Sequence, residues 1–169
     1  MSLPRKIKNF NLFNDGQNYV GQVAEVVLPK LTAKMEEWRG GGMDGPVDVD
    51  LGMEKLTMEW TAGGIIKQVL AQYGTLTHNG VLLRFAGALQ SDDLEEVKAL
   101  EIVVRGRHSE IDMGTAKAGD DTAMKVTSSL SYYKVTLDGE DLIEIDLINF
   151  VKRVGGKDLM DPFRLALGL

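Results

Sequence analysis

The fold of this chain is decided by residues 124–149, MKVTSSLSYYKVTLDGEDLIEIDLIN. Asp138-Gly139 separates two runs in which apolar and polar residues alternate. This dipeptide favours a two-residue hairpin turn, because both turn positions need a positive φ. We therefore predict an antiparallel pair of strands with Leu137 opposite Glu140. In that register one face is expected to join the core, and it carries the cross-strand pairs Leu130/Leu147, Tyr132/Ile145 and Lys134/Ile143.

The second face of the predicted hairpin mixes acidic residues with more apolar side chains than a face turned only to water needs. We interpret the apolar side chains as a contact surface between subunits. A half-exposed sheet face in an ordinary monomer fits the pattern equally well. The apolar members of this face are Tyr133, Val135, Leu137 and Leu142.

The length of 169 residues indicates a single domain, residues 1–169. Hydrophobic residues make up 44% of the chain and charged residues 26%, near the averages of globular proteins. Because no apolar run approaches ~20 residues and no secretory signal is visible, we expect no membrane anchor and folding in a cytoplasm. The absence of cysteine excludes disulfides and thiolate metal sites. A net charge of −6 argues against a general nucleic-acid binder.

The remaining periodicity predicts a mainly β fold. Residues 56–61, 81–90 and 97–107 alternate in polarity as half-buried strands do. A second tight turn at Asp15-Gly16 predicts another hairpin. Residues 64–73 instead place apolar side chains at helical spacing. We predict an antiparallel β-sandwich or barrel with one flanking α-helix.

Glycines interrupt the pattern at residues 40–46, GGGMDGP, and we interpret residues 39–55 as one long loop with a strand-like piece at residues 47–51. Long loops inside compact domains are usually functional or disordered. The segment before this loop, residues 32–38, has helix-favouring residues, but its shortness favours an extended conformation. Near the end of the chain, Asp161-Pro162 predicts a short helix with three side chains packed inward: Phe163, Ala166 and Leu167.

Motifs that would indicate catalysis or cofactor binding are weak. Glycines within residues 40–45 match G-x-G-x-x-G, but a charged stretch precedes them and no helix follows. His108 and Ser109 are adjacent on an extended chain and point to opposite sides, and we expect both His78 and His108 at the surface. The acidic residues within residues 110–121 lack the spacing of a calcium loop. We predict no catalytic residue, no cofactor and no metal site.

Several stretches, taken together and in order, carry a family resemblance. They are YYKVTLDGEDLIEIDLIN of the hairpin, LPKL at residues 28–31, RGGGMDGPVDVDLGMEKLTMEW from Arg39, RFAG at residues 84–87, RGRHSEID at residues 105–112, and the terminal LGL. This collinear set resembles the major tail tube protein of contractile-tailed bacteriophages. R-type pyocins use similar tube proteins, so a phage, a prophage and a tailocin origin all remain open.

The resemblance implies a β-sandwich or barrel whose strands contribute to a multi-subunit inner barrel. It implies homo-hexamer rings stacked into a tube inside a tail sheath protein, with a tape-measure protein and baseplate components as further partners. DNA would pass through the tube without specific binding. The location implied is the virion tail, assembled in the host bacterial cytoplasm, and the family has no catalytic residues to transfer.

Two sets of residues follow from the same analogy. A ring-stacking loop would contain Arg39, Gly40, Gly41, Gly42, Met43, Asp44 and Gly45. The polar faces of the long strands would line the lumen, with Glu101 and Glu144 as candidates. Other readings are a tube component like that of type VI secretion, a small β-barrel binding module, and a hydrolase with paired carboxylates.

Overall fold

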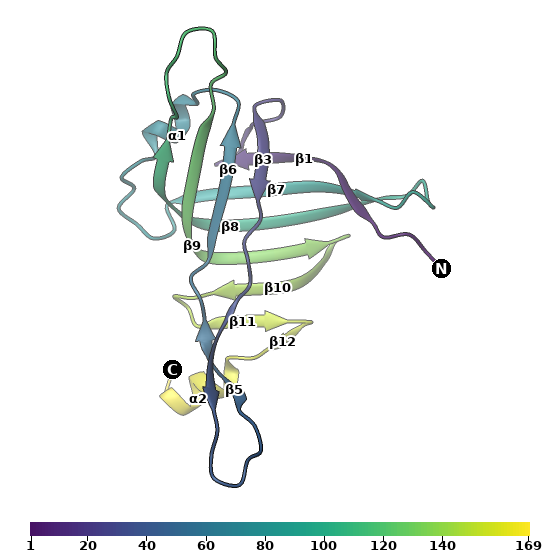
Figure 1. The fold of residues 1–169 in the computed structure, drawn as a ribbon, viewed down its shortest axis with the longest axis vertical. Helices are drawn as coiled ribbons and strands as arrows, with labels where there is room; N and C mark the ends of the chain where they lie inside the picture. Colours follow the sequence, from purple (N-terminus) through teal and green to yellow (C-terminus); the bar gives the residue numbers. More distant parts are fainter.

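The computed structural model describes residues 1–169 as a mainly antiparallel β protein with two short helices (Figure 1). The main sheet has the strand order β12-β11-β10-β9-β8-β7-β1-β2. Its strands are β1 (Lys6–Asn14), β2 (Gln17–Asn18), β7 (Val81–Gln90), β8 (Val97–Asp112), β9 (Met124–Leu137), β10 (Glu140–Asp146), β11 (Val151–Val154) and β12 (Lys157–Asp158).

A second layer covers one face of the main sheet. It consists of β3 (Val23–Val27) and β6 (Thr57–Ala62), which pair with each other, and β6 also pairs with the first half of β9. Figure 1 shows β3, β6 and the start of β9 crossing β7 and β8 at a steep angle. The long strand β9 bends and belongs to both layers, because its partner changes from β6 to β10 along its length.

Gly106 permits the close approach of β8 and β9 at this bend. The ladder between the two strands shifts register between Arg105 and Gly106. A Cβ at Gly106 would lie 2.0 Å from the backbone oxygen of Ser129. Real atoms do not approach so closely, so only glycine fits here without a shift of the strands.

The hydrophobic core lies between the two layers and contains 18 buried residues. The alternation predicted for residues 56–61 is confirmed, because Met58 and Trp60 of β6 point into this core. Leu12 and Leu83 of the main sheet face them from the other layer. The ring of Tyr19 packs against Trp60 with centroids 5.8 Å apart.

The hairpin of β9 and β10 has the predicted turn but a different register. Asp138 and Gly139 have positive φ values of 51° and 82°, and Leu137 lies opposite Glu140. A bulge between Asp141 and Ile143 then shifts the pairing by one residue. A bulge adds an unpaired residue on one strand, so every later side chain meets a different partner.

The predicted core face of β9 is confirmed at Leu130, which is 6% exposed, but it is wrong beyond Ser131. Tyr133, placed by the sequence on the contact surface, lies in the core and is only 5% exposed. It faces Ile145, whereas Tyr132 pairs with Asp146 on the opposite face. The predicted pair Leu130/Leu147 is also wrong, because β10 ends at Asp146 and Leu147 is exposed.

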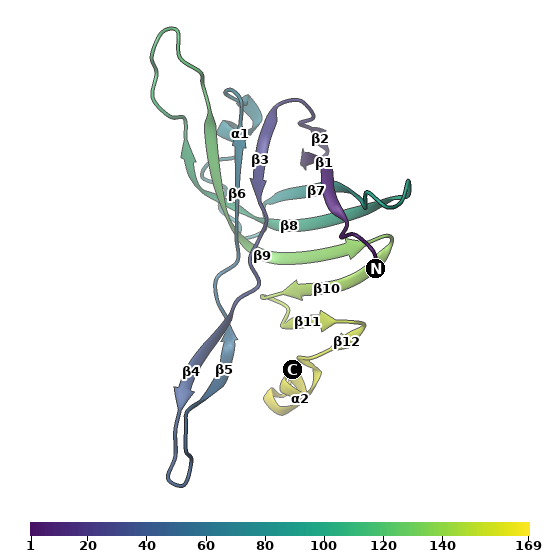
Figure 2. The same cartoon turned by 45° about the vertical axis from the view of Figure 1, so that its right-hand side comes forward.

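Residues 33–53 form a separate two-stranded hairpin instead of a long loop. Its strands are β4 (Ala33–Trp38) and β5 (Val47–Met53), joined by residues 39–46. The extended conformation preferred for residues 32–38 is confirmed, and the strand-like piece at residues 47–51 is part of β5. Figure 2 shows that this hairpin projects away from the body of the molecule.

Helix α1 is shorter than the pattern predicts, whereas α2 is the short helix that the sequence predicts. Helix α1 (Lys67–Ala71) lies within residues 64–73, and Val69 is buried beneath it. Helix α2 (Asp161–Leu167) begins at Asp161, where the sequence predicts it. Its predicted inward packing is wrong, because none of its residues is buried and Phe163 is 57% exposed. Ala166 and Leu167 are exposed as well.

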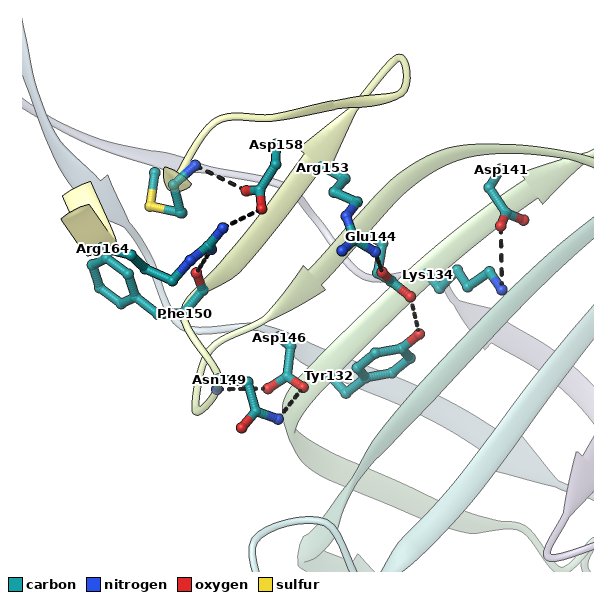
Figure 3. Close-up of polar contacts among 11 residues, drawn as sticks. Tyr132, Lys134, Asp141, Glu144, Asp146, Asn149, Phe150, Arg153, Asp158 and Arg164 are labelled. Carbon is teal, nitrogen blue, oxygen red and sulfur yellow. Dashed lines mark hydrogen bonds and ion pairs between the residues drawn. The ribbon is translucent and has the colours of Figure 1, made fainter. Parts of the chain in front are cut away.

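The contacts of Arg164 explain the orientation of α2. Its guanidinium donates to the backbone oxygen of Phe150 at 2.6 Å and to the carboxylate of Asp158 (Figure 3). The charged side of the helix therefore faces the body of the chain. The apolar side chains of α2 therefore face the solvent.

Candidate functional site: assembly surfaces

The face of the main sheet that points away from the core is polar. Glu101 of β8 and Glu144 of β10, the predicted lumen residues, both lie on it. Arg84 on the neighbouring strand β7 forms an ion pair with Glu101 at 3.1 Å. The guanidinium of Arg84 also lies 4.6 Å from the centre of the Phe13 ring on β1.

Two groups of paired polar side chains continue this face across β9, β10 and β11 (Figure 3). Glu144 accepts a hydrogen bond from the Tyr132 hydroxyl at 2.7 Å and another from Arg153 at 2.9 Å. Lys134 forms an ion pair with Asp141 at 3.4 Å. Burial, and then the hydrogen bond to Glu144, raise the pKa of Tyr132 above its usual range. Tyr132 therefore stays protonated and donates to Glu144.

The charges on this face balance. On β7, β10, β11 and the parts of β8 and β9 that pair with β7 and β10, the positive residues are Arg84, Arg105, Lys134 and Arg153, and the negative residues are Glu101, Asp141, Glu144 and Asp146. Their formal charges cancel. The face is therefore strongly polar without a net field of either sign, and most of its charges have a partner of opposite sign on a neighbouring strand.

The predicted subunit interface is divided by the observed register. Tyr133 is in the core, and Val135 is partly buried and packs against the core. Leu137 and Leu142 are half-buried beside the turn between β9 and β10. A role of Leu137 and Leu142 in a subunit contact stays a prediction.

The hairpin of β4 and β5 has two different faces. Cross-strand partners share a face, so the pairing of Trp38 with Val47 and of Glu36 with Val49 places these four residues on one side. Leu51 follows on the same side, at the alternate position from Val49. The opposite side carries Met35, Glu37, Asp48 and Asp50. One face is therefore apolar and the other acidic.

The tip of this hairpin contains the predicted stacking residues. Arg39 donates from Nε to the backbone oxygen of Met43 at 3.2 Å. The backbone N–H of Gly40 points to the Met43 sulfur at 3.1 Å. Gly42 has a φ of 84°, which other residues rarely adopt. Gly41, Asp44 and Gly45 complete the tip, and all of residues 39–45 lie far from the core.

A buried polar network was missed by the sequence reasoning. His108, expected at the surface, is only 5% exposed. Its ring nitrogens lie 2.9 Å from the Ser128 hydroxyl and 2.9 Å from the Gln72 side-chain oxygen. Gln72 follows α1 and also bonds to Asn14 of β1 at 2.7 Å. Burial lowers the pKa of His108 to about 4, against a smaller opposing effect of Asp15.

The signal for this network was present but ambiguous. His108 continues the core parity of Ile102 and Val104 on β8. The alternation of β8 therefore indicates an inward position for His108, although we expected it at the surface. A polar residue at an inward position needs partners, and these come from residues distant in sequence.

The features that could indicate chemistry do not form a catalytic site. His78 lies 2.8 Å from the Ser131 hydroxyl in an open hollow that also contains Asp146. Asp146 accepts from the backbone of Ile148 and Asn149 and from the Asn149 side chain, not from His78. A triad needs the acid on the histidine. No group of three or more His, Asp or Glu side chains is placed to hold a metal ion.

The G-x-G-x-x-G match lies at the tip of the β4–β5 hairpin, not between a strand and a helix. It therefore lacks the helix N-terminus that a pyrophosphate site uses. Neither of the two helices is long and apolar enough to cross a membrane.

Comparison with known proteins accounts for both the polar sheet face and the lack of a catalytic centre. Residues 4–168 match the family described as phage tail tube protein FII. The chain belongs to this family. The tail tube protein of Escherichia phage P2 is 44% identical to it, over all of this chain and all of that protein. The major tail tube protein of Serratia phage KSP20 is 40% identical, over all of this chain and 99% of that protein.

Solved structures share the fold of this tail tube protein at low sequence identity. A chain of the PVC sheath-tube complex, from an extracellular contractile injection system, is 11% identical with a TM-score of 0.58. The match covers 79% of this chain and 91% of that one. A chain of the anti-feeding prophage cap is 8% identical with a TM-score of 0.61, over 80% and 93% of the two chains.

The resemblance seen in the sequence is thus confirmed. The protein has a structural role in the inner tail tube, and its relatives are structural tube proteins and not enzymes. The mainly antiparallel β fold predicted from the alternation is confirmed as well. The surfaces described above are therefore candidates for contacts within a tube.

Proposed function

We propose that this tail tube protein closes into hexameric rings, that the rings stack into a tube, and that DNA passes through the bore. The observation that carries the proposal is the sheet with a core on one face and charge-balanced polar residues on the other. Such a face can border an aqueous channel along its whole length. It offers neither a large apolar patch nor a net positive field.

The free edges of the main sheet support ring closure. At one edge, β2 pairs with only Phe13 and Asn14 of β1, which leaves the rest of β1 without a partner on that side. At the other edge, β12 contributes only two residues. Exposed edges invite pairing with another chain. Joining one edge to the opposite edge of the next copy is a heterologous contact, and such contacts close into a ring when the rotation allows it.

The bore follows from the geometry of such a ring. If four strands from each of the six copies line the bore, as the family resemblance implies, the inner barrel has about 24 strands; spaced by ~4.8 Å and tilted by roughly 40°, they give a backbone diameter of about 45 to 50 Å. Inward side chains reduce this to a channel of about 40 Å. A duplex of about 20 Å would pass without touching every side. A bore with balanced charges adds few salt-dependent phosphate contacts, so DNA slides through it.

The partners proposed for the tube are a tail sheath protein outside it, a tape-measure protein inside it and a baseplate at its end. Structures similar to this chain come from a sheath-tube complex and from an anti-feeding prophage baseplate. We place the protein in the virion tail, with assembly in the cytoplasm of the bacterial host. A phage, a prophage and a tailocin all fit this proposal.

Electron microscopy of the purified protein tests the proposal. The expected result is hollow hexameric rings or tubes with a bore of about 40 Å. A uniform monomer at high concentration would overturn it and favour a small binding module. Tubes with a bore too narrow for a duplex, or ringed by unpaired arginine and lysine, would keep the assembly but refute the DNA conduit.

A further inference from the structure

The β4–β5 hairpin has no core of its own. It pairs with no other strand, and none of its residues is buried. A single two-stranded hairpin is at best marginally stable in water. Its apolar face nevertheless presents Trp38, which is 61% exposed, together with Val47, Val49 and Leu51. Such a face is stable only when another surface covers it.

A second set of exposed apolar side chains lies on α1 and on the segments just before and after it. We call it the α1 surface, and it consists of Ile65, Leu70, Tyr73 and Leu76. Leu76 is 94% exposed, and no side chain of its own chain covers it. The buried side chain of Val69 and the hydrogen bonds of Gln72 to Asn14 and His108 fix α1 to the body of the molecule, so the position of the α1 surface is fixed as well.

The two surfaces lie at opposite ends of the molecule. Figure 1 has the long axis vertical, with the hairpin at the bottom and α1 near the top, and Figure 2 shows the same separation after rotation. Surfaces at opposite ends of one chain cannot cover each other within that chain. They can cover each other between copies that are stacked along the long axis, which is a heterologous and open-ended contact.

We propose that the apolar face of the β4–β5 hairpin in one copy packs onto the α1 surface of a copy in the next ring. This contact rests on the stacked rings proposed above and names the surface that receives the hairpin. The seven residues of β5 span roughly 23 Å at ~3.3 Å per residue, enough to reach across a ring boundary.

Charge favours α1 over the other exposed helix as the receiving surface. The strands of the hairpin are acidic, with Glu36, Glu37, Asp48 and Asp50 against Lys34, and the charges of Arg39 and Asp44 at its tip cancel. Residues 63–80, which contain the α1 surface, include Lys67 and no Asp or Glu. The segment of α2, residues 157–169, carries Lys157 and Arg164 against Asp158 and Asp161, so its formal charges cancel and it offers the acidic hairpin no net attraction. Opposite net charges favour a contact.

Disulfide cross-linking tests the contact cleanly, because the chain has no cysteine. The test variant carries Val49→Cys and Leu76→Cys, and tubes are grown in reductant and then oxidised. A disulfide forms only when the Cβ atoms come within about 4.5 Å. We expect a ladder of covalent multimers that continues well beyond the size of a ring, since each copy would link to the next ring along the tube.

Matched pairs separate this contact from others. Glu37→Cys with Leu76→Cys moves the hairpin cysteine to the acidic face, and we expect little cross-linking. Val49→Cys with Leu167→Cys tests α2 as the partner. A ladder from the α2 pair and none from the α1 pair would overturn the proposal, as would an α1 ladder that stops at the size of a ring.

A second measurement covers the case in which the cysteine variant does not assemble. Tyr73→Ser with Leu76→Ser removes exposed apolar side chains only, so folding should persist. We expect rings without long tubes in electron micrographs, and tubes of normal length would refute the contact. If the wild type forms tubes but the α1 variants give no cross-link and no defect, the contact is refuted and the proposed function is not. A wild-type protein that forms no tubes refutes both.

Discussion

His108 should make the stability of the fold depend on pH in a specific window. Its pKa is about 4 in the folded chain, against 6.5 for the ordinary side chain, chiefly because burial disfavours the charged ring. Below pH 6.5 the His108 ring is protonated in the unfolded chain, whereas in the folded chain it stays neutral down to about pH 4. Acid therefore stabilises the unfolded state, and stability is lost as the pH falls through this range.

The size of the effect follows from the two pKa values. One unit corresponds to about 1.4 kcal/mol, so His108 should remove about 3 kcal/mol of unfolding free energy between pH 7 and pH 4. This is a large share of the ~5–15 kcal/mol that stabilises a typical domain. The loss should also free α1, because Gln72 bonds to the same ring.

The matched control is His108→Gln, which keeps hydrogen-bonding capacity but does not titrate. Urea unfolding of both proteins is followed at pH 7 and pH 4, at concentrations where sedimentation shows monomer. The carboxylates titrate alike in the two proteins, so the difference between them isolates His108. We expect the wild type to lose about 3 kcal/mol more than the variant. Equal losses would show that burial does not hold the His108 ring neutral.

Four further outcomes are expected. Leu142→Asp should leave the fold intact but lower the concentration-dependent mass in sedimentation, and equal masses for this variant and the wild type would exclude that interface. Val135→Asp should instead unfold the chain, because it places a charge against the core. Shortening residues 40–45 should allow rings and stop long tubes, and normal tubes in micrographs would contradict this. Glu101→Lys should leave Arg84 unpaired and make DNA retention in the tube steeply salt-dependent, with an unchanged salt slope as the contrary result. Gly106→Ala should lower the thermal midpoint measurably, because its Cβ would meet Ser129 at 2.0 Å, and an unchanged midpoint would mean that the strands shift freely.

The sequence by itself determined local features of the fold, such as turns and the alternation of side chains along a strand. The turn at Asp138-Gly139 was predictable because only a few residues accept a positive φ at both positions. The alternation of Met58 and Trp60 was predictable because side chains on a strand repeat every second residue. The order of motifs along the chain was also sufficient to predict the family, without any knowledge of the contacts.

The tertiary structure decided which face of each element is covered. Tyr133 reached the core because β9 skips Ser131 between its partners Gly106 and Arg105 on β8, and the bulge before Ile143 then places Ile145 opposite Tyr133. His108 can be buried because Gln72, 36 residues away, supplies a hydrogen-bond partner to its ring. An apolar face on α2 or on the β4–β5 hairpin looks the same in the sequence whether its own chain or another copy covers it. The hydrophobic effect favours the burial of such a face, but it is non-directional and does not specify which surface buries it.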